Sequence, residues 1–145
     1  WVAQGPGEVQ PPQEQVKLRL FCAPPAGMGG QAFYGWTRGL PPGVEVMPLE
    51  LPARGSRMGE DVPYAASVAD LAQQVLQGLG RQVLAARPFA LLGHSFGAWL
   101  VYEMAQELAR RRVDGWPQPV KIYVSACRSP HLAPVRFDAD RDHPT

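Results

Sequence analysis

A short turn between a buried strand and a long helix constrains this sequence more than any other feature. Residues 89–93 are continuously apolar, as in a strand buried on both faces of a sheet, and residues 96–112 predict an amphipathic helix. Residues 93–97, where the two meet, match the pattern G-x-S-x-G. In this setting the pattern predicts a nucleophile elbow, a turn so sharp that the hydroxyl of Ser95 projects beyond the end of the strand.

The residues around Ser95 have separate expected roles. Gly93 and Gly97 lack a Cβ, which leaves room for neighbouring backbone to approach the turn. Ser95 precedes the helix, whose free N–H groups and dipole favour a developing negative charge. His94 adjoins the serine in sequence and is expected to pack beside the elbow instead of acting as its base. The alternative is an ordinary glycine-rich turn in which Ser95 only caps the helix.

The pattern of strands and helices around the elbow indicates the fold class. Alternating or apolar runs predict strands over residues 16–22, 44–49 and 120–125. Residues 67–83 repeat apolar side chains at three- and four-residue spacing behind Ser67, a candidate N-cap. Strands that alternate with helices predict an α/β fold, with a mostly parallel sheet and helices on both faces.

A glycine-rich loop after the first strand is the second candidate element of a site. A serine that transfers acyl groups needs N–H donors for the oxyanion, one from the residue after the serine, here Phe96, and one from an earlier loop. Residues 26–30 read Ala-Gly-Met-Gly-Gly, so Ala26 and Gly27 are the candidates for the second donor. A plain flexible turn is the alternative. Residues 31–40, which follow, predict a short helix.

Charge, hydropathy and cysteine usage exclude several classes of function. The net charge of +1 argues against nucleic acid as a partner of the whole chain. No apolar run is long enough to span a membrane, and the start of the chain does not resemble a signal peptide. Cys22 and Cys127 are read as buried free thiols, which suits a reducing compartment such as the cytoplasm or an organelle lumen. The sequence predicts a monomer that holds no metal or cofactor.

Four motifs in a fixed order carry a family resemblance. They are FCAPPAG at 21–27, FYGW at 33–36, LELPARGSR at 49–57 and GHSFGA at 93–98. Together they resemble the type II thioesterases, stand-alone α/β-hydrolases that serve polyketide and nonribosomal peptide synthases. The related medium-chain thioesterase of fatty acid synthesis is similar. The resemblance covers roughly residues 16–134.

The resemblance implies hydrolysis of an acyl thioester on the phosphopantetheine arm of an acyl or peptidyl carrier protein. Ser95 would attack the carbonyl and form an acyl-enzyme, which water then hydrolyses. The N–H groups of Phe96 and of Ala26 or Gly27 would bind the oxyanion. Three residues depart from the family pattern: Pro25 precedes the Ala-Gly pair, Met28 is inserted or substituted in the glycine stretch, and Ala53 stands where the family usually has glycine.

The resemblance also implies that the acid and the histidine of the triad come later, beyond a lid. His131 matches a loop residue of the family, and Asp138 and His143 lie in a polar tail with nothing to hold an imidazole in place. The chain is therefore expected to be truncated before the lid and the last strands, and to show little turnover by itself. The expected organisation is a disordered tail or linker at 1–15, part of a hydrolase domain at 16–134 and a frayed polar terminus at 135–145.

Three other interpretations stay open. An acyl-carrier acyltransferase also has a Gly-His-Ser motif, but it requires a Gly-Gln-Gly loop that this sequence lacks. A general serine esterase or lipase would share the elbow. A non-catalytic relic that binds a carrier protein or a lipid would explain why half of the triad is missing.

Overall fold

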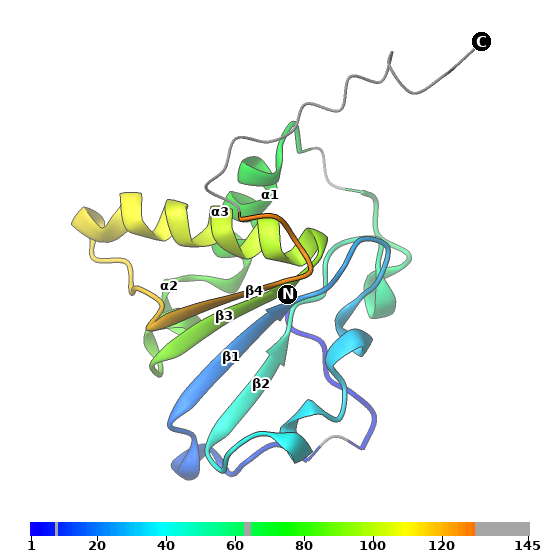
Figure 1. Ribbon diagram of the computed structural model, residues 1–145, viewed down its shortest axis with the longest axis vertical. Coiled ribbons are helices and arrows are strands. Elements are labelled where there is room, and N and C mark those ends of the chain that lie inside the picture. Colours follow the sequence, from blue (N-terminus) through cyan, green and yellow to red (C-terminus); the bar gives the residue numbers. More distant parts are fainter. Residues whose placement is uncertain (8, 63–64, 130–145) are drawn as a thin grey trace.

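A computed structural model describes residues 1–7, 9–62 and 65–129. Within these residues, four parallel strands form the centre of the molecule. The strands are β1 Leu18–Ala23, β2 Val44–Pro48, β3 Phe89–His94 and β4 Lys121–Ser125. They lie in the order β2-β1-β3-β4, and every neighbouring pair is parallel (Figure 1). The mostly parallel α/β sheet predicted from the sequence is therefore confirmed.

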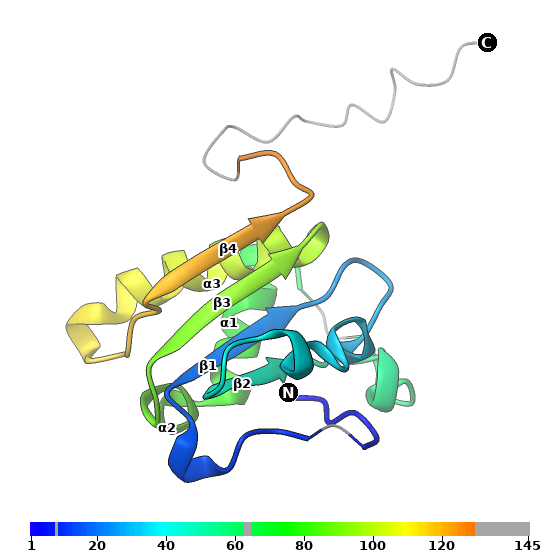
Figure 2. The same cartoon turned by 60° about the horizontal axis from the view of Figure 1, so that its bottom comes forward.

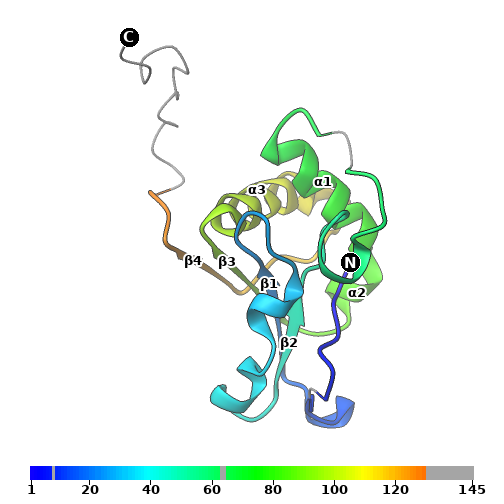
Figure 3. The same cartoon turned by 90° about the vertical axis from the view of Figure 1, so that its right-hand side faces the viewer.

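Two α-helices cover one face of the sheet. They are α1 Val68–Leu79 and α3 Phe96–Arg110, and Figure 3 shows both on the same side of the strands. Phe21 and Leu91 from the central strands are fully buried beneath them, and the Phe21 ring meets Phe89 edge-on with 5.8 Å between ring centroids. Burying side chains of this size stabilises the fold by about 2 kcal/mol each.

Short 3-10 helices cover the other face, over β1 and β2. They span Gly30–Phe33 and Trp36–Gly39. Phe33 is buried with Leu20 and Val46 in a second apolar cluster. The sequence predicts one short helix over residues 31–40, but Gly35, with a φ of 81°, divides it in two because the left-handed conformation interrupts helical hydrogen bonding.

The helix α1 begins as predicted and ends earlier than predicted. The Ser67 hydroxyl accepts a hydrogen bond from the N–H of Asp70 at 3.1 Å, which makes Ser67 the N-cap. The apolar repeat predicts a helix that continues to residue 83. Instead Gly80, with a φ of 79°, ends α1, and a separate short helix α2 follows over Arg81–Ala85.

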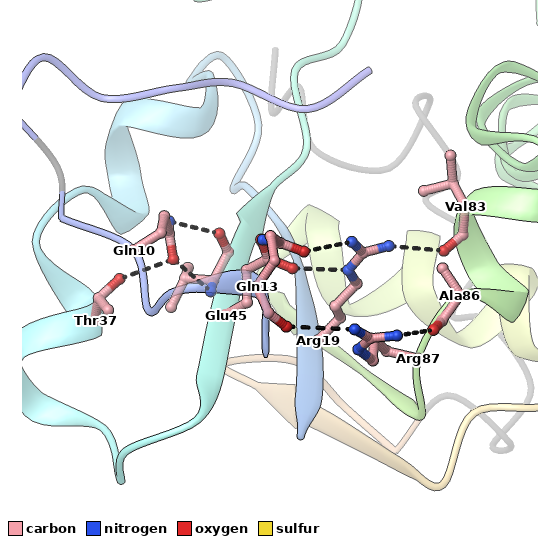
Figure 4. A network of polar contacts seen from close by, with 9 residues as sticks. Gln10, Gln13, Arg19, Thr37, Glu45, Val83, Ala86 and Arg87 are labelled. Atoms are coloured by element: carbon pink, nitrogen blue, oxygen red, sulfur yellow. Dashed lines mark hydrogen bonds and ion pairs between the residues drawn. The ribbon is translucent and has the colours of Figure 1, made fainter. Parts of the chain in front are cut away.

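The N-terminal segment differs from the tail expected over residues 1–15. The N–H of Ala3 donates to the carbonyl of Pro48 at 2.8 Å, and Val2 forms an antiparallel bridge with Leu49. Farther along, Gln10 bonds both backbone groups of Val46, at 2.9 and 3.2 Å (Figure 4). The segment thus pairs with the outer edge of β2 (Figure 2). The domain boundaries themselves stay a prediction.

No segment of the described residues pairs with the opposite edge of the sheet, which β4 forms. All five residues of β4 are exposed, and its apolar side chains Ile122, Tyr123 and Val124 are 38–48% exposed. The expected burial of both thiols holds for Cys22 only, since Cys127, just after β4, is partly exposed. Within the described ranges, no helix has the length and apolar character needed to cross a membrane.

Candidate active site

The candidate site lies where the order of the strands reverses, at the carboxyl ends of β1 and β3. The loop that follows β1 leads to the 3-10 helices on one face, whereas β3 leads into α3 on the other. Connections that leave adjacent parallel strands toward opposite faces open a crevice between them. Ser95 follows β3 at this crevice and residues 24–30 follow β1, so the topology places the two predicted site elements side by side.

The backbone at Ser95, the centre of the predicted elbow, makes a sharp and strained turn between β3 and α3. Its φ is 55° and its ψ is −117°, a sparsely populated conformation for a residue with a side chain. Two hydrogen bonds hold it: the N–H of Ser95 donates to the carbonyl of Ser125 at 2.8 Å, and its carbonyl accepts from Ala98 at 3.0 Å. The turn is therefore fixed between β4 and the first turn of α3.

The two glycines of the elbow are required by close packing. A Cβ on Gly93 would collide with the backbone of Gly97. A Cβ on Gly97 would in turn collide with the carbonyl groups of Ala23 and Pro24 at the end of β1. The elbow thus packs directly on the start of the loop that carries the other candidate residues.

The candidate oxyanion donors from both segments line one pocket. It has a volume of about 320 Å³, and Ala26, Gly27 and Phe96 all contribute to its wall. No backbone carbonyl among the described residues accepts the N–H of Ala26 or Gly27. Most of the remaining lining is apolar: Pro25, Met28, Leu51, Pro52, Val62, Ala65 and Leu71, with Arg54 as the charged exception. The pocket suits an apolar group next to free N–H donors.

No base for Ser95 is found in the part of the chain that the structure describes. His94 is exposed, and its Nδ1 lies 3.1 Å from the hydroxyl of Ser125 on β4. No other histidine belongs to the described residues, where no side chain hydrogen bonds to the Ser95 hydroxyl. His131, Asp138 and His143 lie outside them.

Glu50, which the sequence patterns did not indicate as a site residue, lies between the two loops that contribute to the pocket. Its side chain is only 2% exposed and accepts hydrogen bonds from the N–H groups of Gly30, at 2.9 Å, and Ser56, at 3.3 Å. One feature of the sequence could have indicated this role: Glu50 is an acidic residue between two leucines, directly after a strand. A charge at such a buried position is expected only where hydrogen-bond or ion-pair partners are present.

An ion pair between Arg57 and Glu60 lies next to Glu50. Arg57 donates to Glu60 at 2.7 Å through Nε and to the carbonyl of Glu50 at 3.0 Å. The hydrogen bond with Glu60 raises the pKa of Arg57 and lowers the pKa of the Glu60 carboxyl. The guanidinium also lies over the ring of Trp1, 4.5 Å from its centroid, which joins the N-terminus to this turn.

Comparison with known proteins gives a consistent result. Residues 18–143 match the family model described as Thioesterase domain. The gramicidin S biosynthesis protein GrsT of Aneurinibacillus migulanus is 37% identical over 125 residues, which cover 85% of this chain and 45% of that protein.

Two solved structures are also similar. RedJ, the thioesterase of the prodiginine pathway in Streptomyces coelicolor, is 42% identical with a TM-score of 0.73, and the match covers 90% of this chain and 46% of RedJ. YbtT, a type II thioesterase of the yersiniabactin pathway, is 26% identical with a TM-score of 0.67, over 84% of this chain and 47% of that one. The chain spans about half the length of the relatives it matches.

Proposed function

The chain belongs to the thioesterase domain family, as its four motifs predicted, and on that premise we propose that the protein hydrolyses acyl thioesters on the phosphopantetheine arm of an acyl or peptidyl carrier protein. The observation that carries this proposal is the pocket beside the elbow, since the backbone N–H donors proposed from two distant segments line it together. An arrangement of this kind suits a reaction that develops a negative charge on a carbonyl oxygen next to Ser95.

In the proposed first step, the hydroxyl oxygen of Ser95 attacks the thioester carbonyl while its proton passes to a base. The N–H groups of Phe96 and of Ala26 or Gly27 stabilise the tetrahedral oxyanion. The carbon–sulfur bond then breaks, the thiol of the arm leaves with a proton, and the acyl group stays on Ser95 as an ester.

In the second step, water attacks the acyl ester, and the products are a carboxylic acid and the free hydroxyl of Ser95. We assign no part of this chemistry to His94, because its ring pairs with Ser125. In the α/β-hydrolase order, the acid and the histidine follow the nucleophile along the chain. The proposed base is therefore a histidine that comes after the described residues. No cofactor takes part apart from the arm that carries the substrate.

The lining of the pocket favours an acyl group with apolar character. Leu51, Val62 and Leu71 contribute side chains to it, and Arg54 is the cationic residue among the lining. Apolar groups that enter such a pocket are removed from water, which contributes to binding in proportion to the area buried. The product thiol stays on the carrier protein, which is the proposed partner.

The test uses the full-length protein and a carrier protein loaded with a short acyl chain, and it follows release of the free thiol. We expect wild-type protein to release it catalytically. Ser95→Ala should lower the rate by at least roughly 10³-fold, since loss of a serine nucleophile removes the covalent route. Ser125→Ala is the matched control, because it removes a hydroxyl from the adjacent strand and leaves the elbow serine in place.

The other interpretations predict different outcomes of the same assay. A general esterase would cleave simple esters but not the carrier-bound thioester. An acyltransferase would move the acyl group to a second thiol in preference to water. A non-catalytic relic would bind the carrier without releasing thiol, and Ser95→Ala would then change nothing.

A further inference from the structure

Glu50 joins two loops that both contribute residues to the lining of the candidate pocket. One carboxylate oxygen, Oε1, accepts the N–H of Gly30 at 2.9 Å, at the end of the loop that carries Ala26 and Gly27. The other, Oε2, accepts the N–H and the hydroxyl of Ser56, both at 3.3 Å. Each oxygen therefore accepts hydrogen bonds from a different loop.

The two loops are shaped to admit this carboxylate. A Cβ on Gly29, in the first loop, would collide with Glu50 Oε1, and a Cβ on Gly55, in the second, would collide with the same carboxylate. Gly55 also has a φ of 49°, a conformation that favours glycine. Both loops thus place a glycine against Glu50 and allow their backbones to close around it.

Burial makes the two loops depend on each other through this side chain. A carboxylate that is 2% exposed has lost most of its hydration, and it remains favourable only while its hydrogen bonds are made. Movement of either loop would leave one oxygen of this buried carboxylate without its hydrogen bonds. The backbone of Glu50 adds to the connection, because its N–H donates to Trp1 at 2.9 Å and its carbonyl accepts from Arg57 at 3.0 Å.

We propose that Glu50 is a positioning residue that fixes the spacing of the two loops and so holds the N–H of Ala26 or Gly27 at the oxyanion site. The inference rests on the proposed function of Ser95 and its oxyanion donors. Glu50 does not touch the substrate. It acts through Gly30, a few residues along the chain from the donors, so its effect should appear in stabilisation of the transition state and much less in ground-state binding.

The Glu50→Gln variant distinguishes the positioning role from the general effect of changing a buried carboxylate. The substituted amide keeps one acceptor oxygen, but its NH₂ group must face either the N–H of Gly30 or that of Ser56, and one loop is released. Glu45→Gln is the matched control. Glu45 is also buried, at 6% exposed, and accepts from Gln13 at 2.6 Å and Arg19 at 2.7 Å, but it lies toward the amino end of β2 (Figure 4).

The experiment compares the two variants in the full-length protein. Glu50→Gln should lower kcat on the carrier thioester about 10- to 100-fold, since small displacements of an oxyanion donor have effects of that size. Its KM should change less than about twofold, because the interaction lost belongs to the transition state. Glu45→Gln should leave kcat within about twofold of wild type even where it lowers the melting temperature as much. Equal losses of kcat in the two variants, or a change confined to KM, would overturn the inference.

A second measurement keeps this inference separate from the identity of the substrate. A fluorophosphonate forms a tetrahedral adduct on a reactive serine and needs no carrier protein. If wild type reacts with the probe but cleaves no carrier thioester, the proposed substrate is wrong, whereas the positioning role of Glu50 is still testable. Slower labelling of Glu50→Gln than of Glu45→Gln then supports that role. Equal labelling rates count against that role. Wild-type protein that reacts with neither reagent overturns both proposals.

Discussion

The Nδ1 atom of His94 lies 3.1 Å from the hydroxyl oxygen of Ser125, across the neighbouring strands β3 and β4. His94 is the sequence neighbour of Ser95, and its ring is paired with a different serine. The contact links the end of β3 to the end of β4, beside the elbow, and it implies a structural role for this histidine.

Replacement of His94 should therefore have a small effect on catalysis. We expect His94→Ala to lower the rate of thioester hydrolysis by less than about tenfold, whereas loss of a general base costs roughly 10²- to 10⁴-fold. Ser125→Ala removes the same contact from the other side and should give a similar small change. If His94→Ala is as inactive as Ser95→Ala, the ring acts in the chemistry and the structural assignment is wrong.

Gly97 should tolerate no side chain. We expect Gly97→Ala to destabilise the protein by roughly 2–3 kcal/mol, because the new Cβ meets the backbone of Ala23 and Pro24, which cannot move like a flexible side chain. Urea unfolding measures the loss. Gly59→Ala is the control, since an added Cβ there meets nothing within 4 Å. Similar unfolding midpoints for the two variants would contradict the packing described for the elbow.

The protein should be more stable with glycine in place of Ala53. The φ of Ala53, 58°, lies in the left-handed region, which costs a residue with a Cβ about 1–2 kcal/mol, while glycine adds about 0.4–1 kcal/mol of entropy to the unfolded chain. We expect Ala53→Gly to stabilise the protein by roughly 0.5 kcal/mol in thermal or urea unfolding. Ala85→Gly, in α2, should have the opposite sign. A loss of stability in Ala53→Gly would show that its methyl group contributes more to packing than the backbone conformation costs.

Glu107 should make stability depend on acidic pH. Burial raises the pKa of its carboxyl, but hydrogen bonds from Arg111 at 2.6 Å and Arg110 at 3.0 Å outweigh burial, and the net pKa is lowered. A lowered folded-state pKa stabilises the protein above the unfolded value of about 4.3, and this contribution is lost as the pH falls through the folded-state pKa.

Glu107→Gln tests this sign. The variant should be less stable than wild type by roughly 2 kcal/mol at pH 7, and the difference should shrink as the pH falls below about 4. Unfolding in urea across this pH range gives both values. Glu103→Gln, on the same helix, is the control, because Glu103 makes no ion pair with a described residue. A difference that stays constant with pH would mean that the ion pairs of Glu107 contribute little.

The exposed strand β4 should cause association when these 145 residues are produced alone. No described segment pairs with the outer edge of β4, so this edge offers backbone groups and the exposed side chains of Ile122, Tyr123 and Val124 to a second copy. Light scattering should show a mass that rises with concentration, contrary to the monomer expected from the sequence. Ile122→Lys should reduce that rise. A constant monomer mass at high concentration would contradict the prediction.

Local sequence patterns were sufficient for the features that depend on near neighbours. The apolar run before Ser95 and the amphipathic pattern after it predicted β3 and α3, because burial selects the side chains at each step of a strand or helix. The cap at Ser67 was predicted in the same way, since its partner Asp70 is three residues away.

Features that depend on distant contacts could not be predicted in this way. Glu50 contacts Gly30, 20 residues earlier, and nothing in the local pattern pairs them. The N-terminal segment resembles a tail in composition, yet it pairs with the outer edge of β2. No other strand among the described residues occupies that edge. The apolar repeat continues through Gly80, but the positive φ of this glycine ends the helix, and glycine is compatible with either outcome.

The positive φ at Ser95 has a thermodynamic consequence. A serine held at 55° and −117° stores about 1–3 kcal/mol of conformational strain, which the packing of the sheet and of α3 must offset. Glycine at this position would relieve the strain and remove the hydroxyl at the same time. Stability and the reactivity proposed for Ser95 therefore oppose each other at this one residue. A search for heat-resistant variants that ignored activity would favour exchanges of Ser95 that leave a better-folded protein without the proposed nucleophile.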